Sequence, residues 1–173
     1  MRFGIIGEGD AAMQAYQDLG AAQGAGVAAV MAGSVAMRRE LEAMLSTHIV
    51  ETAGEVCEAP DVEAIYIALP AGPREEAIRQ GLESGKHVLV AGPWDAPLAE
   101  GIALCALAQE RGVALGISAP WAVSGGHLAA RDLARAGLLG EIVAWSDDLL
   151  RPQPLADTLR QGLRPVALFS WLT

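Results

Sequence analysis

Lysine is almost missing from this sequence: Lys86 is the only one, and every other basic residue is an arginine. A reaction that needs a lysine ammonium group therefore has one candidate. Positive charge is scarce as well, because 12 lysines and arginines face 21 aspartates and glutamates, which gives a formal net charge of −9. Nucleic acids and anionic membranes are polyanions, so this balance argues against both as partners.

Cysteine is equally sparse. Cys57 and Cys105 are far apart, and neither lies in a Cys-x-x-Cys pair or near a histidine at metal-ligand spacing. We predict two buried thiols of an intracellular protein and no metal site. The sequence also lacks an uninterrupted apolar run of ~18 residues, the length of a membrane-spanning helix. We therefore expect a cytoplasmic protein with no membrane segment.

Apolar residues, by contrast, make up 52% of the sequence and fall into short runs separated by helical patterns. Strands are predicted over residues 3–6, 27–31, 48–50, 62–69, 86–90 and 113–117. Alternating short apolar strands and helices indicate a parallel sheet with helices on both faces. We predict an α/β, doubly wound Rossmann domain over residues 1–118, with strand order 3-2-1-4-5-6 and a crevice at the carboxyl ends of the first and fourth strands.

Residues 119–173 have a different pattern. A helix is predicted around 129–136, a strand over 142–146 and short helices further on, which together make a short, truncated α+β appendage. The strand has an apolar face and no predicted neighbour in this chain, and such a strand is stable only when another element or another chain packs on it. We expect residues 141–173 to form a homodimer interface or to dock on another protein.

The turn between the first strand and the first helix reads GEGDAA, the context of a dinucleotide fingerprint. Gly7 allows the tight turn, Gly9 lets a pyrophosphate approach the backbone, and Ala12 lets the helix pack closely on the strand. Glu8 and Asp10 are acidic where the anion would lie, unless their side chains point away. The turn therefore predicts Rossmann architecture strongly and a bound dinucleotide less strongly.

No acidic residue follows the second strand, where one would hold the ribose 2′-hydroxyl of NAD. Ser34, Arg38 and Arg39 stand there instead. If a dinucleotide binds, this pattern favours NADP(H). The alternative is that Ser34 only caps a helix and the arginines form a solvated face.

Among the other polar and aromatic candidates, His127 follows two glycines near the expected cleft and is the one histidine we would test as an acid or base. His48 and His87 are expected to have core or sheet-end roles. Trp94 and Trp121 follow the fifth and sixth strands, where they would line the crevice or simply pack.

Four segments resemble the glucose–fructose oxidoreductase / inositol dehydrogenase (Gfo/Idh/MocA) family. They are the glycine turn, PDVEAIYIALP at 60–70, SGKHVLV at 84–90 and GLLGEIV at 137–143. The resemblance covers residues 2 to about 150. It implies a nicotinamide-binding domain, hydride transfer to or from a sugar, polyol or related carbonyl, and a cofactor-binding set that includes Leu69, Pro70, Gly92 and Pro93.

The same resemblance exposes departures. The family's Glu-Lys-Pro reads here as Ala91-Gly92-Pro93, so glycine stands where a lysine acts on the reacting hydroxyl or carbonyl, and glycine cannot transfer a proton. Arg74 stands where the family often has histidine. We expect residues 119–173 to correspond to a remnant of the family's substrate-binding domain, because they are too few to build its broad sheet.

These departures predict a catalytically silent relative, a pseudoenzyme that acts as a scaffold or partner subunit. One alternative is an NADP(H)-dependent oxidoreductase that reduces a small carbonyl or oxidises a polyol without the lysine. Another is a binding module for a different small ligand in the crevice.

Overall fold

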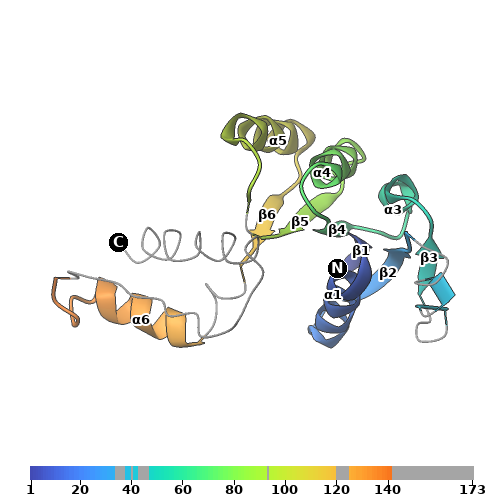
Figure 1. The fold of residues 1–173 in the computed structure, drawn as a ribbon. Helices are drawn as coiled ribbons and strands as arrows, with labels where there is room; N and C mark the ends of the chain where they lie inside the picture. The colour runs from blue at the N-terminus through green and yellow to red at the C-terminus, as the bar shows by residue number, and fades with distance from the viewer. Residues whose placement is uncertain (34–37, 40, 43–46, 93, 120–124, 142–173) are drawn as a thin grey trace. The chain divides into compact units, whose positions relative to one another are not determined.

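A parallel sheet forms the centre of the first part of the chain (Figure 1). The computed structural model describes residues 1–33, 38–39, 41–42, 47–92, 94–119 and 125–141. The chain divides into two compact units after Ser118, and each is described by itself.

Within the described residues the sheet has six strands in the order β3-β2-β1-β4-β5-β6, and every neighbouring pair is parallel. The strands are β1 Arg2–Gly7, β2 Gly26–Met31, β3 His48–Val50, β4 Ala64–Ala68, β5 His87–Ala91 and β6 Leu115–Ser118. The predicted doubly wound fold and its strand order are confirmed.

Helices cover both faces of this sheet (Figure 1). They are α1 Gly9–Ala21, α3 Ala53–Glu58, α4 Pro73–Glu83 and α5 Leu98–Arg111. Adjacent residues of β1 show the two layers, because Ile5 packs with α1 and Ile6 packs with α3 and α4, and both are fully buried. Successive side chains of a strand point to opposite faces, so a strand covered on both sides is apolar at every position.

Local sequence signals explain several element ends. Thr52 Oγ1 accepts a hydrogen bond from the Glu55 N–H at 3.3 Å and caps α3. Pro73 occupies the first turn of α4, where its missing N–H costs nothing. Gly112 ends α5 in the left-handed conformation, with φ of +67°.

The apolar residues whose spacing indicates helix α5 in the sequence are not the ones that it buries. The sequence marks Leu98, Ile102 and Cys105 as its periodic apolar residues, but Leu98 is 76% exposed and Ile102 is 61% exposed. Leu104 and Ala108 face the core instead. The prediction of a buried Cys105 is therefore wrong, whereas Cys57 is buried as predicted.

In the second unit, α6 Gly125–Arg135 is confirmed where a helix was predicted around 129–136. Gly137 and Gly140 follow it with positive φ. The predicted strand over 142–146 and the later helices lie outside the described residues. In the part of the chain that is described, no helix combines the length and the apolar character needed to cross a membrane.

Candidate functional site

The glycine turn at the carboxyl end of β1 has the shape of a phosphate cradle. A Cβ on Gly7 would lie 3.2 Å from the Ala68 Cβ and 3.3 Å from the Ala12 Cβ, so the missing side chain lets β4 and α1 approach β1. Gly9 has φ of +55°, and apart from its chain neighbours and the backbone of its own helix no described atom lies within 4 Å of the Cβ position it leaves empty. Open space before the N-terminus of a 13-residue helix fits a pyrophosphate.

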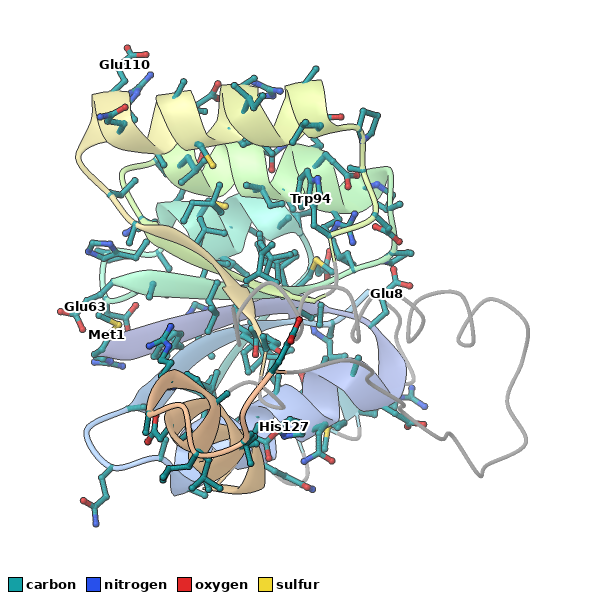
Figure 2. All side chains as sticks on the ribbon, turned by 90° about the vertical axis from the view of Figure 1, so that its left-hand side faces the viewer. Met1, Glu8, Glu63, Trp94, Glu110 and His127 are labelled. Carbon is teal, nitrogen blue, oxygen red and sulfur yellow. The ribbon has the colours of Figure 1, made fainter. Side chains whose placement is uncertain are left out.

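The Glu8 carboxylate does not cap the helix that it precedes. Glu8 is the N-cap of α1, yet its side chain forms no capping hydrogen bond. Its Oε1 lies 3.5 Å from the position of a Cβ on Gly33, just beyond the end of β2. Figure 2 shows Glu8 and Trp94 at one end of the sheet, with Met1 and Glu63 at the other.

The expected ligands of a 2′-phosphate are only partly described. Ser34 lies outside the described residues. Arg38 is held by carboxylates, because its Nη1 lies 2.5 Å from Glu51 Oε1 and its Nε lies 3.7 Å from Glu42 Oε1. The guanidinium charge is therefore already compensated within the protein.

Gly92 sits at the carboxyl end of β5 in a space too small for a side chain. A Cβ there would lie 2.8 Å from Ile117 Cγ2 and 2.9 Å from the Ser118 carbonyl oxygen. The backbone itself is tied to β6, since the Gly92 N–H donates to the same Ser118 oxygen at 3.3 Å. Any larger residue, lysine included, requires a shift of the backbone. Pro93 lies outside the described residues.

The one lysine of the chain is engaged at the opposite end of β5. Lys86 Nζ donates to the carbonyl oxygens of Ala59 at 3.0 Å and Val62 at 2.7 Å. These bonds close the connection between α3 and β4. Lys86 therefore does not replace the lysine that the family resemblance places at position 92.

A buried ionic cluster is formed by Arg74 and Glu75, which follow β4, and Asp95, which follows β5. Arg74 is 3% exposed and donates to Glu75 Oε1 from Nε at 3.0 Å and from Nη2 at 2.6 Å. Its Nη2 also donates to Asp95, and its guanidinium lies 5.2 Å from the centre of the Trp94 ring. Glu75 Oε2 in turn accepts from the Gly72 N–H at 2.5 Å.

The pKa values of this cluster keep the pair ionised. Burial alone would lower the pKa of Arg74, but its hydrogen bonds to Asp95 and Glu75 outweigh burial and raise it. Burial alone would raise the pKa of Glu75, but hydrogen bonds from Arg74 and from backbone N–H groups lower it overall. Sequence reasoning missed this cluster. The available signal was that Arg74 and Asp95 follow neighbouring parallel strands.

Leu69 and Pro70 follow β4 at the same end of the sheet. Leu69 is half-buried against the core, whereas Pro70 is exposed and its carbonyl oxygen accepts from the Arg74 N–H at 3.2 Å. Both stand next to the glycine turn, because Gly7 pairs with Ala68. Gly7, Leu69, Pro70 and Gly92 thus all lie at the carboxyl ends of β1, β4 and β5, and their role in holding a cofactor stays a prediction.

The histidines are spread over the molecule. His48 is exposed in β3, and His87 Nδ1 accepts from the Ala114 N–H at 3.0 Å, which is a sheet-end role. His127 lies in α6 of the second unit and remains a prediction as an acid or base. Among the described residues, no three His, Cys, Asp or Glu side chains are grouped closely enough to hold a metal ion.

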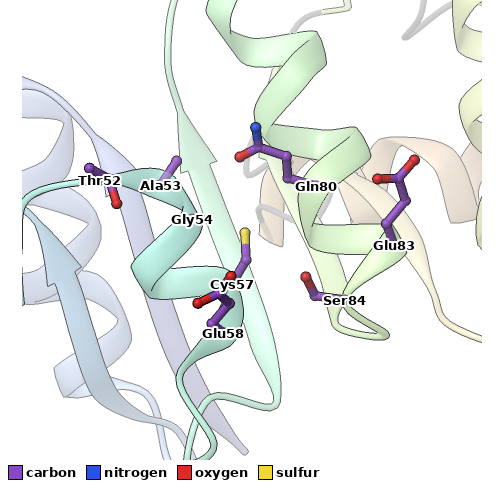
Figure 3. A pocket seen from close by; sticks show the side chains of 8 residues that line it. All are labelled: Thr52, Ala53, Gly54, Cys57, Glu58, Gln80, Glu83 and Ser84. Carbon is purple, nitrogen blue, oxygen red and sulfur yellow. The ribbon is translucent and has the colours of Figure 1, made fainter.

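Two hollows lie away from the glycine turn. A cavity of about 520 Å³ between α3 and α4 is lined by Thr52, Ala53, Gly54, Cys57, Glu58, Gln80, Glu83 and Ser84 (Figure 3). Burial raises the pKa of Cys57 to about 11 despite the nearby Lys86, so its thiol is unreactive at neutral pH.

The second hollow, about 550 Å³, is apolar and lies between α5 and the strands β5 and β6. Trp94 borders it and packs over Gly101, with Nε1 3.3 Å from the position of a Cβ on that glycine. Trp94 thus has a packing role here. Trp121 lies outside the described residues.

Residues 1–118 match the model of an oxidoreductase family with an NAD-binding Rossmann fold. A dTDP-3,4-didehydro-2,6-dideoxy-alpha-D-glucose 3-reductase from Streptomyces violaceoruber is 35% identical over 111 residues, which are 64% of this chain and 32% of that protein. An uncharacterized oxidoreductase from Escherichia coli is 31% identical over 64% of this chain and 32% of its own length. The chain thus spans about a third of the length of these curated relatives.

Solved structures agree with this fold. A 3-ketoreductase from Actinomadura kijaniata, in complex with NADP and TDP-benzene, has a TM-score of 0.74 at 30% identity, over 82% of this chain and 44% of that one. An apo scyllo-inositol dehydrogenase from Lactobacillus casei has a TM-score of 0.83 at 18% identity, over 100% of this chain and 55% of that one, a likeness of fold alone. This chain belongs to the Gfo/Idh/MocA oxidoreductase family, and its residues 1–118 form the family's NAD-binding Rossmann domain.

Proposed function

We propose that this protein binds a nicotinamide dinucleotide but does not catalyse hydride transfer, and so serves as a scaffold or partner subunit. The observation that carries the proposal is Gly92. The family resemblance places the acid–base lysine there, and the backbone of β6 leaves no room for any side chain. A site without a proton donor loses the ~10²- to 10⁴-fold that general acid–base catalysis contributes.

The binding half of the proposal is supported by the glycine turn. Gly7 and Ala12 bring α1 close to the sheet, and Gly9 leaves open space before the N-terminus of α1. Gly7, Gly9 and Ala12 would hold the pyrophosphate side, and Leu69, Pro70, Gly92 and Pro93 would border the nicotinamide. In relatives that catalyse the reaction such a dinucleotide carries the hydride, whereas here the residues named would only hold and position it.

No other described cation at this end of the sheet takes the place of the missing lysine. Arg74 is buried, ion-paired to Glu75 and Asp95, and has a raised pKa, so it holds its proton. Lys86 lies at the opposite end of β5. Neither cation is therefore available to give a proton to a substrate oxygen at the carboxyl ends of β4 and β5.

Titration with NADH and NADPH, followed by thermal unfolding and by absorbance at 340 nm, tests both halves. We expect at least one dinucleotide to raise the unfolding temperature, since a ligand at 100 times its Kd adds ~2.7 kcal/mol of stability. We expect no oxidation of the bound cofactor with keto sugars or sugar nucleotides. Turnover above the rate without protein would refute the silent role.

A second candidate is a reductase of nucleotide-linked keto sugars. The names of the 35% identical relative and of the Actinomadura kijaniata complex favour it. The Actinomadura kijaniata complex contains NADP, which is also the cofactor predicted from Ser34 and Arg38. The ion pair of Arg38 with Glu51 argues against NADP(H) in this chain. Oxidation of NADPH by a dTDP-linked 3-keto sugar would select this candidate.

The scaffold role depends on residues 141–173 as the proposed contact with a second copy or another protein. Size-exclusion chromatography with light scattering at micromolar concentration tests the homodimer. A molar mass near 36 kDa, twice the 18.0 kDa of one chain, is expected. A mass of one chain would exclude the homodimer and leave a different protein as the partner to seek.

A further inference from the structure

We propose that Glu8 determines which dinucleotide this site accepts, favouring NAD(H) over NADP(H). The proposal rests on the proposed binding function, because it names the cofactor of the same site. It also gives a role to a residue that the sequence pattern presents only as an obstacle to the pyrophosphate.

The geometry of Glu8 directs its carboxylate to the neighbouring strand. Its backbone is extended, with φ of −128° and ψ of 148°, and its side chain caps no N–H of α1. Instead Glu8 Oε1 and Cγ lie 3.5 Å and 3.8 Å from the position of a Cβ on Gly33. Since β1 and β2 are adjacent and parallel, their carboxyl ends lie side by side, and a side chain from one reaches the other.

This is where Rossmann domains recognise the adenosine ribose. An Asp or Glu at the end of β2 accepts a hydrogen bond from the ribose 2′-hydroxyl of NAD. Ala32 and Gly33 provide no carboxylate in this chain. Glu8 supplies one from the glycine turn, with its Oε1 within van der Waals contact of the position of a Cβ on Gly33. The missing acid of the second strand is thus replaced from the first.

The same carboxylate opposes a 2′-phosphate, because two negative charges would meet. Of the two arginines predicted near that phosphate, Arg38 is already bound to Glu51 at 2.5 Å and lies 3.7 Å from Glu42, whereas Arg39 is exposed. A 2′-phosphate would have to displace these carboxylates and still face Glu8. A ribose hydroxyl meets neither obstacle.

Equilibrium titration of NADH and NADPH, by nucleotide fluorescence or calorimetry at fixed ionic strength, tests the proposal. The wild type should bind NADH about tenfold or more tightly than NADPH, the effect of one close charge pair. Glu8→Gln should reduce this ratio about tenfold, chiefly by strengthening NADPH binding. Glu8 is exposed, so the variant should fold normally, as circular dichroism would verify.

Asp10→Asn is the matched control, because Asp10 is the other acid of the turn and lies in the first turn of α1. It should strengthen both nucleotides alike and leave their ratio unchanged, since the pyrophosphate is common to both. A wild type that prefers NADPH, or a ratio unchanged in Glu8→Gln, would overturn the role of Glu8 while leaving dinucleotide binding intact. Failure of both nucleotides to bind any variant would overturn the proposed function and this inference together.

Discussion

At the scale of single residues, Gly92 stands where the family resemblance places a lysine, and it is also a position where packing leaves no room for a side chain. Its missing side chain is required by Ile117 and Ser118 of the edge strand, so the loss of the lysine is fixed by the backbone as well as by the sequence. A lysine introduced at position 92 would therefore not place its ammonium group where the family's lysine has it.

We predict that Gly92→Lys shows no hydride transfer and that Gly92→Ala already lowers the free energy of unfolding by ~1–3 kcal/mol, the usual cost of overpacking. Gly116→Ala in β6 is the control, because its added Cβ would meet only Leu89 at an ordinary 3.6 Å. Urea unfolding measures both. A Gly92→Ala protein as stable as the control would show that β6 yields easily.

Arg74 is the residue on which the ionic cluster depends. Replacing it with methionine leaves Glu75 buried without its cation, and breaking a buried ion pair from one side costs ~3–5 kcal/mol. We expect Arg74→Met to lower the urea midpoint accordingly, and Arg74→Met combined with Glu75→Gln to recover part of the loss. Equal stability of the single and double variants would contradict a coupled pair.

The lowered pKa of Glu75 predicts a pH dependence of stability. Because the folded-state pKa lies below the ordinary value of 4.5, the stabilisation is present above that value and disappears as the pH falls through the folded pKa. The stability difference between wild type and Glu75→Gln should therefore shrink on acidification below pH 4.5. Urea titrations between pH 3 and 7 measure it, and a constant difference would contradict the pairing.

The two thiols should differ in reactivity. Cys57 is buried and its pKa is raised to about 11, whereas Cys105 is exposed. A thiol reagent at pH 8 should modify Cys105 in the folded protein and both cysteines only after unfolding, and Cys105→Ser should abolish the fast reaction. Rapid labelling of two thiols in native protein would contradict the burial of Cys57.

At the scale of elements, α5 shows that the apolar residues which indicate a helix need not be the ones that it buries. Its sequence is apolar on more than one stripe, so periodicity identifies a helix without choosing its orientation. Packing against α4 and β6 makes the choice, and it buries Leu104 rather than Leu98.

This choice has an energetic consequence. Leu104→Ala should destabilise the protein by ~2–5 kcal/mol, because it opens a cavity in the core. Leu98→Ala should change stability by no more than ~0.5 kcal/mol, as expected for an exposed position. Chemical denaturation of the two variants provides the comparison. A larger loss for Leu98 would reverse the assignment of the two stripes.

At the scale of the whole molecule, all the buried apolar residues among those described fall within the segment of the chain from Ile5 to Ala108. The first unit thus has a core of its own. We predict that a fragment of residues 1–118 unfolds cooperatively and keeps its dinucleotide affinity, as measured by thermal unfolding with and without NADH. A fragment without a cooperative transition would show that the first unit depends on the rest of the chain.

The sequence by itself determined the alternation of strands and helices, the order of the six strands and the glycine turn. These follow from local periodicity and from the fixed hand of parallel crossovers, which leave few arrangements open. Through the family resemblance, it also identified position 92 as the place where the family has a lysine and this chain has a glycine.

Only the tertiary structure decided where the side chains of neighbouring strands meet. Glu8 lies against Gly33, Arg74 joins Asp95, and Gly92 is closed in by Ser118. The two residues of each pair are distant along the chain, and the strand order places them at one end of the sheet without giving the distance between their side chains. The charge of Glu8 was visible in the sequence, but its direction, toward the second strand, was decided by the packing of two parallel strands.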